Sequence, residues 1–359
     1  MHVARLKLRD FRNYRKLDAE FVPGFHLILG SNAQGKTNLL EAIYALATLR
    51  SFRGVGSAQL VHHGREGFFV GAKIIGTATT EIQFHWSAAG RQLSQNHQAV
   101  RRLADYFGTV RAVVFCTEDL QLVKGLARGR RRFMDLILSQ TVPNYLTTLQ
   151  RYVQALRSRN ALLKQRTQDT PLLTSFTREL VDAGTRIMQA RAQLLPNLSR
   201  HVAAAYSQLA PESELITMTY EPAVKTDFQT ELNRSSAREK VVCTTLVGPH
   251  RDDIALNLQG RSAAQFASEG QKRSIAIALK MAQSELLIQS TGVPPILLLD
   301  DVMGELDRQR RDGLLPLLAR NGEQRGQVFM TCTEENWTHE LGRDLHRWQV
   351  AGGALKRLP

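Results

Sequence analysis

GSNAQGKTN, residues 30–38, lies between the apolar run FHLIL (25–29) and the helical pattern LLEAIYALATL (39–49). Gly30, Gly35, Lys36 and Thr37 have the spacing of a phosphate-binding loop, in which backbone N–H groups and a helix N-terminus bind phosphate oxygens. Lys36 would contact the β- and γ-phosphates, and the Thr37 hydroxyl would complete the coordination of Mg²⁺. The preceding strand pattern and following helix pattern favour a true P-loop over a chance turn. The expected ATP-binding residues are Gly30, Ser31, Asn32, Ala33, Gln34, Gly35, Lys36 and Thr37.

Composition sets broad limits on the class of protein. The chain has 359 residues, enough for one large domain plus a second element. Its hydrophobic content of 43% and charged content of 22% are ordinary globular values. However, 47 Lys and Arg face 33 Asp and Glu, for a net charge of +14. This excess favours polyanionic partners, with nucleic acid first and an anionic membrane surface second, while solubility without a partner is the alternative.

The cysteines and the N-terminus bear on the cellular compartment. Cys116, Cys243 and Cys332 are far apart and lack metal-ligand spacing, so they fit small apolar residues in a reducing compartment. MHVARLKLRDF alternates apolar and basic residues, which indicates a strand and not a signal peptide. No apolar run approaches the roughly 18 residues of a membrane helix. We therefore expect a cytoplasmic protein.

The middle of the chain differs in character from its ends. Residues 1–115 mix short strand patterns with one strong helix at 37–49, and residues 118–210 read as helix throughout. Around the polar turn QRTQDTP (165–171), apolar side chains recur at helical spacing and Arg159 interrupts them. They are Tyr145, Leu149, Tyr152, Leu156, Leu163, Phe176, Leu180, Ala183, Ile187, Ala190 and Leu194. The pattern indicates an antiparallel helical pair, which packs against the protein body or, as a second explanation, against a partner helix.

Strand patterns return from about residue 215. They are ELITMTY (214–220), REKVVCTTLVGPHRDDIALNL (238–258) with a turn inside it, PILLLD (295–300) and QVFMTC (327–332). Helix patterns lie between them at 270–288 and about 307–319. Segments of α/β type therefore bracket a helical insert.

A P-loop enzyme also needs a carboxylate at the end of a buried strand to hold Mg²⁺. VVFCTED (113–119) is the nearer candidate, but Cys116 and Thr117 separate its short apolar run from the acids. Residues 296–299 are four large apolar residues, as in a central parallel strand, and Asp300 and Asp301 follow them. Asp300 would bind Mg²⁺ through water and Asp301 would polarise the attacking water. An acidic turn after a core strand is the alternative.

The two halves of this site come from opposite ends of the chain, so the ends must fold together. This is the plan of ATP-binding-cassette (ABC) heads of the SMC and Rad50 type. Such heads carry a signature turn that acts in trans on a partner's nucleotide, and ASEGQKRSI (267–275) supplies Ser268, Gly270 and Gln271 before a long helix. The segment GELD then resembles the D-loop at a dimer interface: Gly304, Glu305, Leu306 and Asp307.

The expected fold is thus α/β: an ABC-type ATPase head, a P-loop NTPase assembled from both chain ends, with an inserted α-helical domain. The expected boundaries are 1–117 and 215–359 for the head and 118–214 for the insert.

Four segments together carry a family resemblance that runs from end to end. LEAIY (40–44), TEDLQLVKGLARGRRRFMD (117–135), LVGPHRDDI (246–254) and LLLDDVMGELD (297–307) are similar, in this order, to motifs of the RecF family. RecF proteins are bacterial recombination mediators and SMC-like ATPases. The chain departs from the family pattern at Ala33, Thr117, residues 126–127 and Gly304, where Gly, Pro, a small residue with Pro, and Ser or Ala are usual. Ala33 should be tolerated if its φ is negative.

The resemblance implies an ATP-dependent homodimer with ATP and Mg²⁺ as cofactors and weak, DNA-stimulated ATP hydrolysis. It implies sequence-independent binding of single-stranded, gapped and duplex DNA, especially at single-strand to double-strand boundaries, and no membrane. The partners it implies are the mediators RecR and RecO, with which the protein would assist RecA loading in DNA repair, replication restart and SOS induction.

DNA contacts are harder to place. The densest basic cluster comprises Lys124, Arg128, Arg130, Arg131 and Arg132, and a second surrounds Arg157, Arg159, Lys164 and Arg166. Such side chains would bind phosphates without sequence choice, or they form a solvated helical face. Arg131 or Arg132 could instead pair with Asp135 one helical turn on. His250, Arg251, Asp252 and Asp253 receive no role.

Two other functions fit part of the pattern. The ATPase subunit of an ABC transporter shares the motif order, but QVFMTC is followed by Thr333 and offers Thr331 where such subunits usually have a His after the last core strand. A non-enzymatic DNA-binding protein with a vestigial site is the second alternative. Lys36, Thr37, Asp300 and Asp301 argue against it, because all the groups needed for ATP chemistry are present.

Overall fold

The computed structural model describes residues 1–165, 170–210, 213–323, 326–333 and 345–359. The chain forms two compact units, the first from Met1–Asp119, Ala204–Pro211 and Arg273–Pro359, the second from Leu120–Ala203 and Glu212–Lys272. The first unit therefore contains both ends of the chain. The sequence pattern assigns residues from 215 onward to the head. In the structure, residues 213–272 belong instead to the same compact unit as the helical segment.

The first unit contains a six-stranded sheet with the order β15-β14-β3-β13-β12-β8. Its strands are β3 (Gly24–Leu29), β8 (Ala112–Phe115), β12 (Ile296–Asp300), β13 (Gln327–Cys332), β14 (Leu345–Ala351) and β15 (Ala354–Arg357). All neighbours are parallel except β14 and β15. The apolar runs of β8, β12 and β13 are buried, as expected of central parallel strands. Because β3 and β12 both flank β13, their carboxyl ends lie at one edge of the sheet.

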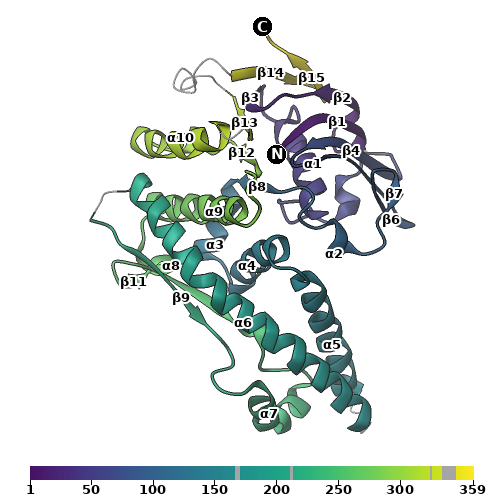
Figure 1. Cartoon of the computed structure of the whole chain (residues 1–359), viewed down its shortest axis with the longest axis vertical. Coiled ribbons are helices and arrows are strands. Elements are labelled where there is room, and N and C mark those ends of the chain that lie inside the picture. Colours follow the sequence, from purple (N-terminus) through teal and green to yellow (C-terminus); the bar gives the residue numbers. More distant parts are fainter. Residues whose placement is uncertain (166–169, 211–212, 324–325, 334–344) are drawn as a thin grey trace. The chain divides into compact units, whose positions relative to one another are not determined.

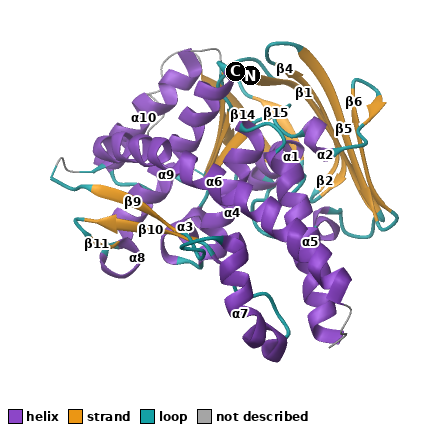
Figure 2. Ribbon diagram, turned by 60° about the horizontal axis from the view of Figure 1, so that its bottom comes forward, coloured by secondary structure: helices purple, strands orange, loops and turns teal. Residues whose placement is uncertain are grey.

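A second sheet of the first unit is antiparallel, with the order β2-β1-β4-β5-β6-β7. Its strands are β1 (His2–Phe11), β2 (Tyr14–Glu20), β4 (Gly67–Ile75), β5 (Thr79–Ser87), β6 (Gly90–Gln95) and β7 (Gln98–Ala99). Figure 2 shows it as a curved sheet beside α1. In β1, buried Leu6 and Leu8 alternate with exposed Lys7 and Arg9, so one face meets the core and the other meets solvent.

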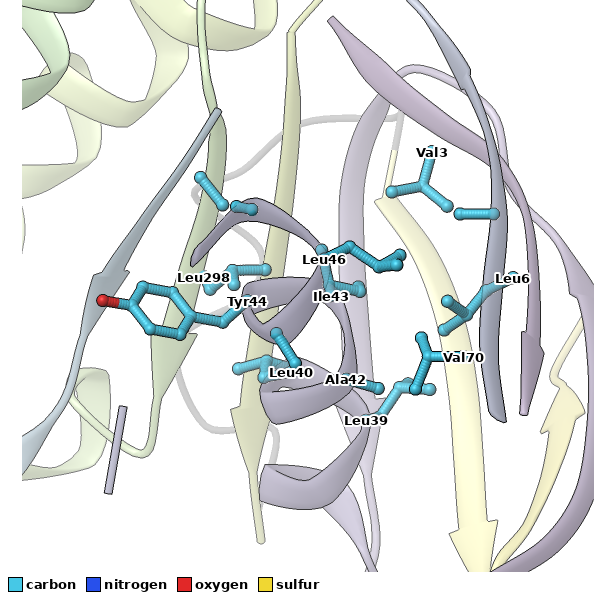
Figure 3. Packing of buried hydrophobic residues seen from close by; sticks show 14 of the residues in the cluster. Val3, Leu6, Leu39, Leu40, Ala42, Ile43, Tyr44, Leu46, Val70 and Leu298 are labelled. Carbon is cyan, nitrogen blue, oxygen red and sulfur yellow. The ribbon is translucent and has the colours of Figure 1, made fainter. Parts of the chain in front are cut away.

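Helix α1 (Lys36–Thr48) joins the two sheets through one hydrophobic core. Figure 3 shows Leu39 and Ile43 of this helix together with Leu6 and Val70 of the antiparallel sheet and Leu298 of the parallel sheet. Burying one such side chain contributes about 1.5–3 kcal/mol, so this core is a main source of stability. The other helices of the unit are α2 (Leu103–Tyr106), α10 (Arg308–Glu323), which contacts β13 and β3 (Figure 1), and α9 (Glu269–Thr291), which begins in the second unit.

The second unit combines helices with a small antiparallel sheet of order β11-β10-β9. Its elements are α3 (Leu120–Lys124), α4 (Ala127–Thr141), α5 (Tyr145–Gln165), α6 (Thr170–Leu209, which ends in the first unit), β9 (Ile216–Glu221), α7 (Phe228–Val242), β10 (Asp253–Leu258), β11 (Arg261–Ser262) and α8 (Ala263–Phe266). Tyr145 and Tyr152 of α5 share a buried core with Leu180 and Ile187 of α6. This arrangement supports internal packing over a partner helix as the explanation of the apolar pattern; of the turn at 165–171, residues 166–169 lie outside the described residues.

The predicted strand at the start of REKVVCTTLVGPHRDDIALNL is wrong, because residues 238–242 form the end of α7 and only residues 253–258 are a strand. Val241 and Val242 gave the strand pattern, but their side chains are 80% and 46% exposed and so do not bury a sheet face. Asp227 caps the helix by accepting a hydrogen bond from the N–H of Thr230 (2.8 Å). The N-terminal cap and the burial of other side chains of the helix therefore outweigh the strand preference of the two β-branched residues.

LVGPHRDDI owes its shape to a buried polar network around Arg191, which is 2% exposed. The guanidinium of Arg191 donates to Asp135 (2.9 Å), to Asp252 (2.9 Å) and to the carbonyl oxygen of Pro249 (2.7 Å). Asp252 also accepts hydrogen bonds from the Tyr220 hydroxyl and from a backbone N–H. Asp252 thus has a structural role, because its buried charge is paired and hydrogen-bonded.

Three smaller predictions can be compared with the structure. The N-terminal alternation does form a strand, β1. Cys116, Cys243 and Cys332 all carry free thiols. Within the described ranges, every helix is too short or too polar to cross a bilayer.

A buried histidine ties together several strands of the parallel sheet. His26 is fully buried; its Nε2 is 2.8 Å from the carbonyl oxygen of Val22, and its Nδ1 accepts a hydrogen bond from Trp348 (3.0 Å). A neutral ring with its proton on Nε2 satisfies both contacts. Burial lowers the pKa of His26 from 6.5 to about 4, although the contact with Val22 opposes this shift.

We expect His26 to make stability depend on pH between about 6.5 and 4. The unfolded chain binds a proton at higher pH than the folded chain, so the contribution of the neutral ring is complete above pH 6.5 and is lost as pH falls through about 4. The shift corresponds to roughly 3 kcal/mol. Urea unfolding of the wild type and of His26→Gln should show a stability difference that shrinks by this order between pH 7 and pH 4. A difference that is constant across this range would contradict the assignment.

Candidate nucleotide-binding site

The P-loop connects β3 to α1 in the first unit, as the sequence predicts. Lys36 is only 5% exposed, and its ammonium donates to the carbonyl oxygens of Gly30 (2.6 Å) and Ser31 (3.3 Å). The cation therefore lies against the loop whose N–H groups would bind phosphates. Gly30 has φ +156°, and a Cβ there would lie 2.5 Å from the carbonyl oxygen of Val350, so the loop packs directly on β14.

Asn13 and Tyr14 hold the loop in place, although the sequence patterns did not identify them. The Tyr14 hydroxyl donates to the carbonyl oxygen of Gly35 (3.0 Å), and the Asn13 amide donates to that of Gln34 (2.7 Å). Gly35 has φ +116°, and a Cβ there would lie 2.5 Å from the Asn13 amide nitrogen. Gly35 is thus required both by its backbone conformation and by this close approach. The sequence feature that could have identified them is FRNY (11–14), where polar residues directly follow the apolar end of a strand pattern.

Ala33 does not meet the condition under which the sequence predicts it to be tolerated in this loop. That condition is a negative φ, but Ala33 has φ +65°, in the left-handed region. A residue with a Cβ pays roughly 1–2 kcal/mol there, which explains why Gly suits this position better. The P-loop of this chain therefore carries local backbone strain.

Asp300 completes the site from the other end of the chain. Its Oδ1 accepts hydrogen bonds from the hydroxyls of Thr37 (2.8 Å) and Thr331 (2.9 Å). Burial raises the pKa of Asp300, and the bonds from Thr37 and Thr331 oppose that effect. Asp301 follows with φ +54°, and its N–H donates to the Thr331 hydroxyl (2.9 Å). The structure thus brings Thr37, Asp300 and Asp301 to one edge of the sheet.

The rejected candidate VVFCTED has a structural role instead. Asp119 accepts a hydrogen bond from the N–H of Cys116 (2.9 Å) and forms an ion pair with the largely buried Lys280 (2.9 Å). The carboxylate of Asp119 is therefore already committed within the core of the first unit.

A cavity of about 670 Å³ lies beside the P-loop within the first unit. Its lining includes Arg12, Asn13, Asn32, Ala33, Gly35, Lys36, Thr37, Asn38, Arg53, Gln59, Val61, His62, His63 and Asp301. Arg12 is fixed by two hydrogen bonds to the buried carboxylate of Glu41 (2.7 and 2.9 Å). Arg53, His62 and His63 were not predicted, because isolated basic residues in a polar loop have no motif. The cavity combines cations and amides, which suits a polyanionic nucleotide.

The signature turn begins α9 and belongs to the second unit. The Ser268 N–H donates to the side chain of Gln271 (2.8 Å), and the Gln271 N–H donates to the Ser268 hydroxyl (3.2 Å). These two bonds form a capping box. Gln271 also donates to Glu214 (2.9 Å). The turn is thus rigid while Ser268 itself is exposed, which leaves it available to another molecule.

The D-loop segment of the first unit is partly exposed. Gly304 and Glu305 face solvent and Leu306 is buried, while Asp307 caps α10 by accepting a hydrogen bond from the N–H of Arg310 (2.9 Å). A Cβ at Gly304 would meet open space, so the Ser or Ala usual at this position would also fit.

The basic cluster divides into engaged and exposed side chains. Arg130 makes a bidentate pair with Asp253 (2.7 and 2.8 Å), and Arg131 donates to the carbonyl oxygen of Asp252 (2.6 Å). Lys124 pairs more loosely with Glu269 (3.4 Å). Lys124 is exposed, as are Arg128 and Arg132 on α4, for which the structure shows no carboxylate within 4.0 Å among the described residues. In the second cluster, Arg159 is 4% exposed and pairs with Glu239 (2.6 Å). The suggested pairing of Asp135 on its own helix is replaced by bonds from Arg191 and Tyr145.

We expect Ala33→Gly to stabilise the protein by about 1 kcal/mol, because Gly adopts a positive φ without strain. The matched control is Ala204→Gly, at an exposed position inside α6, which should instead destabilise by about 1 kcal/mol because Gly disfavours helix. Urea midpoints at equal slope measure both changes. A loss of stability in Ala33→Gly would mean that the positive φ is not strained.

Comparison with known proteins agrees with this geometry. The profile of the RecF/RecN/SMC N terminal domain family matches residues 2–351. A relative from Lactococcus lactis subsp. cremoris (strain MG1363), described as DNA replication and repair protein RecF, is 38% identical over 99% of this chain and 99% of its own length. A protein from Symbiobacterium thermophilum with the same description is also 38% identical, over 99% of this chain and 98% of its own length.

Solved structures give the same result. The recombination mediator protein RecF-ATP in the RecFOR pathway superimposes with a TM-score of 0.91 at 30% identity, covering 100% of this chain and 98% of its own. An Smc head domain from Pyrococcus furiosus has a TM-score of 0.58 at 15% identity, covering 99% and 96%, which shows a shared fold alone. The sheets, the P-loop with its distant acidic strand, and these similarities lead to one conclusion: the chain belongs to the RecF family of SMC-like ABC ATPases.

Proposed function

We propose that this protein is an ATP-dependent DNA-binding recombination mediator. It would dimerise on DNA when it binds ATP, act at single-strand gaps and single-strand to double-strand junctions, and assist RecA loading with RecR and RecO in repair, replication restart and SOS induction. The contact between Thr37 and Asp300 (2.8 Å) carries the proposal, because it places both halves of a nucleotide site together. Family membership and a relative solved as RecF-ATP in the RecFOR pathway support it. A cytoplasmic location is part of the proposal, because the DNA of bacteria such as Lactococcus lactis, the source of one relative, lies in the cytoplasm.

ATP binding would use the P-loop as it stands. The N–H groups of residues 30–37 would cradle the phosphates, and Lys36 would exchange its contacts with loop carbonyls for contacts with phosphate oxygens. Thr37 and Asp300 would hold Mg²⁺, since a hydroxyl and a carboxylate 2.8 Å apart are oxygen ligands of the kind this cation prefers. When bound, Mg²⁺ supplies charge neutralisation on the β- and γ-phosphates.

Asp301 would act as the general base toward the attacking water, while Lys36 would stabilise charge on the transferred phosphoryl group. The Thr331 hydroxyl accepts a hydrogen bond from the main-chain N–H of Asp301 and donates one to the carboxylate of Asp300, so one hydroxyl holds the backbone at Asp301 and the side chain of Asp300. Slow, DNA-stimulated turnover fits a protein in which ATP binding drives assembly and hydrolysis resets it. ATP would then shift the equilibrium through its higher affinity for the dimer.

Dimerisation would complete each site with groups from the other protomer. Ser268, Gly270 and Gln271 are proposed to contact the γ-phosphate in trans, and the exposed D-loop segment at 304–305 would lie at the interface. The capping box of Ser268 and Gln271 supports this role, because it pre-orients the turn before a partner binds.

DNA binding through the basic cluster stays a proposal. Lys124, Arg128, Arg130, Arg131 and Arg132 would bind phosphates, with the exposed Arg128 and Arg132 the most direct candidates. No observation supports the alternative function as an ABC transporter subunit. The family profile that matches this chain is that of RecF/RecN/SMC proteins, and the relatives reported above are described as RecF.

The test of this function is the molar mass of Asp301→Asn in solution by light scattering, with and without Mg²⁺-ATP. We expect the mass to double only with Mg²⁺-ATP, because loss of the general base slows hydrolysis roughly 100-fold or more and traps the dimer. Lys36→Met and Asp300→Asn should stay monomeric with ATP, since they lose the phosphate contact and the proposed Mg²⁺ ligand.

The signature turn is tested by adding Ser268→Arg to Asp301→Asn, which should abolish the doubling while ATP still binds. Ser207→Arg is the matched control, because Ser207 is exposed on α6 and belongs to neither the signature turn nor the D-loop segment, and it should leave the doubling intact. A protein that binds ATP but stays monomeric would contradict the trans mechanism. A Lys36→Met dimer trapped by ATP would contradict the proposed role of the P-loop lysine.

A further inference from the structure

The solvent face of the antiparallel sheet carries an ordered row of side chains that the nucleotide site does not use. Strand register aligns Lys16, Arg9, Phe69, His85 and Gln92 directly across β2, β1, β4, β5 and β6. At about 4.8 Å per strand, the row spans about 19 Å. Along β1 and β4 the row alternates with core residues such as Leu8 and Phe68, so it lies on the face opposite the core, where it lines a groove of about 750 Å³. We refer to these five residues and Lys7 as the platform.

Two aromatic rings form the centre of the platform. The ring centroids of Phe69 and His85 are 4.5 Å apart and the ring planes are tilted by 43°. A Cβ on Gly71 would lie 2.6 Å from Cζ of Phe69, so this ring leans along its own strand over the bare glycine. Gly71 therefore allows the Phe69 ring to lie against the sheet. His85 is exposed, and partial burial together with the charge of Arg9 lowers its pKa, which favours the neutral ring.

The platform has an excess of positive charge. Lys7, Arg9 and Lys16 are exposed, and none of them has a carboxylate within 4.0 Å among the described residues. Two acids line the groove, but each is neutralised from outside it: Asp18 by a bidentate pair with Arg5 (2.7 Å) and Asp10 by Arg65 (3.4 Å). Three cations therefore remain for a polyanionic ligand.

Packing in the core does not explain why position 69 carries an aromatic side chain. The neighbouring Phe68 and Phe84 point into the core of the first unit, whereas Phe69 belongs to the opposite, solvent-facing side of β4. A face with two exposed lysines is also a poor protein interface, because protein interfaces are depleted in lysine. Flat rings beside cations instead match the way single-stranded nucleic acids are bound, with bases stacked on aromatics and phosphates on basic side chains.

We propose that the platform binds single-stranded nucleic acid, with unpaired bases stacked on Phe69 and His85 and phosphates bound by Lys7, Arg9 and Lys16. Duplex DNA hides its base faces, so it could use the cations and not the rings. The proposal rests on the proposed function for DNA binding itself. It adds the surface and the side chains that bind single-stranded DNA, and this binding does not depend on ATP or on dimerisation.

The experiment measures fluorescence anisotropy of the full-length, nucleotide-free protein with labelled oligo(dT) of about 15 nucleotides and with a blunt duplex of about 20 base pairs. Phe69→Leu keeps an apolar side chain over Gly71 but removes the aromatic ring, and Gly71→Ala displaces the ring without removing it. Each should weaken oligo(dT) binding roughly ten-fold and leave duplex binding within about two-fold. Arg9→Gln should weaken both ligands and reduce the salt slope for oligo(dT) by about 0.7.

Phe176→Ala is the matched control, because Phe176 is also half-buried but lies on α6, and it should leave oligo(dT) binding unchanged. Oligo(dT) affinity that is unchanged in both Phe69→Leu and Gly71→Ala would overturn the proposal. An equal loss for oligo(dT) and duplex would also overturn it, since phosphates alone would then explain binding. So would displacement of oligo(dT) by poly-glutamate at equal charge concentration, which would indicate an acidic protein partner.

Failure of this inference can be separated from failure of the proposed function. If the wild type binds neither oligo(dT) nor duplex, with or without Mg²⁺-ATP, DNA binding by this chain is wrong altogether. If the wild type binds both and the platform variants bind equally well, only the platform is wrong.

Discussion

Thr37 and Asp300 are 263 residues apart in the chain, and their side chains meet at 2.8 Å because β3 and β12 both pair with β13. This pairing requires the two ends of the protein to fold as one unit. Strands β8 and β14 run parallel to these three strands, so their carboxyl ends lie at the same edge of the sheet, where the P-loop begins. The nucleotide site is thus a consequence of strand order, and two stretches between its halves, Leu120–Ala203 and Glu212–Lys272, form a second unit.

Positive φ angles occur at the nucleotide site of the first unit, and a buried polar network holds one segment of the second unit in place. In the P-loop, Ala33 and Gly35 have positive φ, and Asp301 does so beside Asp300. In the second unit, the buried charge of Arg191 organises LVGPHRDDI through Asp135 and Asp252. Strained positions such as Ala33 and Asp301 persist only where the surrounding structure holds them, and they are common at sites that bind ligands. The hydrophobic core around α1 provides this support in the first unit.

Elements with a strong local signal were predictable from the sequence. The P-loop, the buried strand before Asp300 and the helix after Ser268 follow from apolar patterns and spacing alone. Val241 and Val242 misled the strand prediction, because β-branched residues can also face solvent at the end of a helix. The φ of Ala33 and the support from Asn13 depend on contacts between distant segments. The Phe69 and His85 pair depends on strand register, which no local pattern determines.

The central claim is that Thr37 and Asp300 act as one Mg²⁺-dependent site, and calorimetry of ATP binding to a double-mutant cycle tests it most directly. Thr37→Val and Asp300→Asn, singly and together, would be compared with and without Mg²⁺, with Thr37→Ser as the variant that keeps the hydroxyl. The account predicts that each single change removes the Mg²⁺-dependent gain in affinity and that the double variant is no weaker than the weaker single one. Losses that simply add, with part of the Mg²⁺ effect left in each single variant, would show that the two residues act independently and contradict the account.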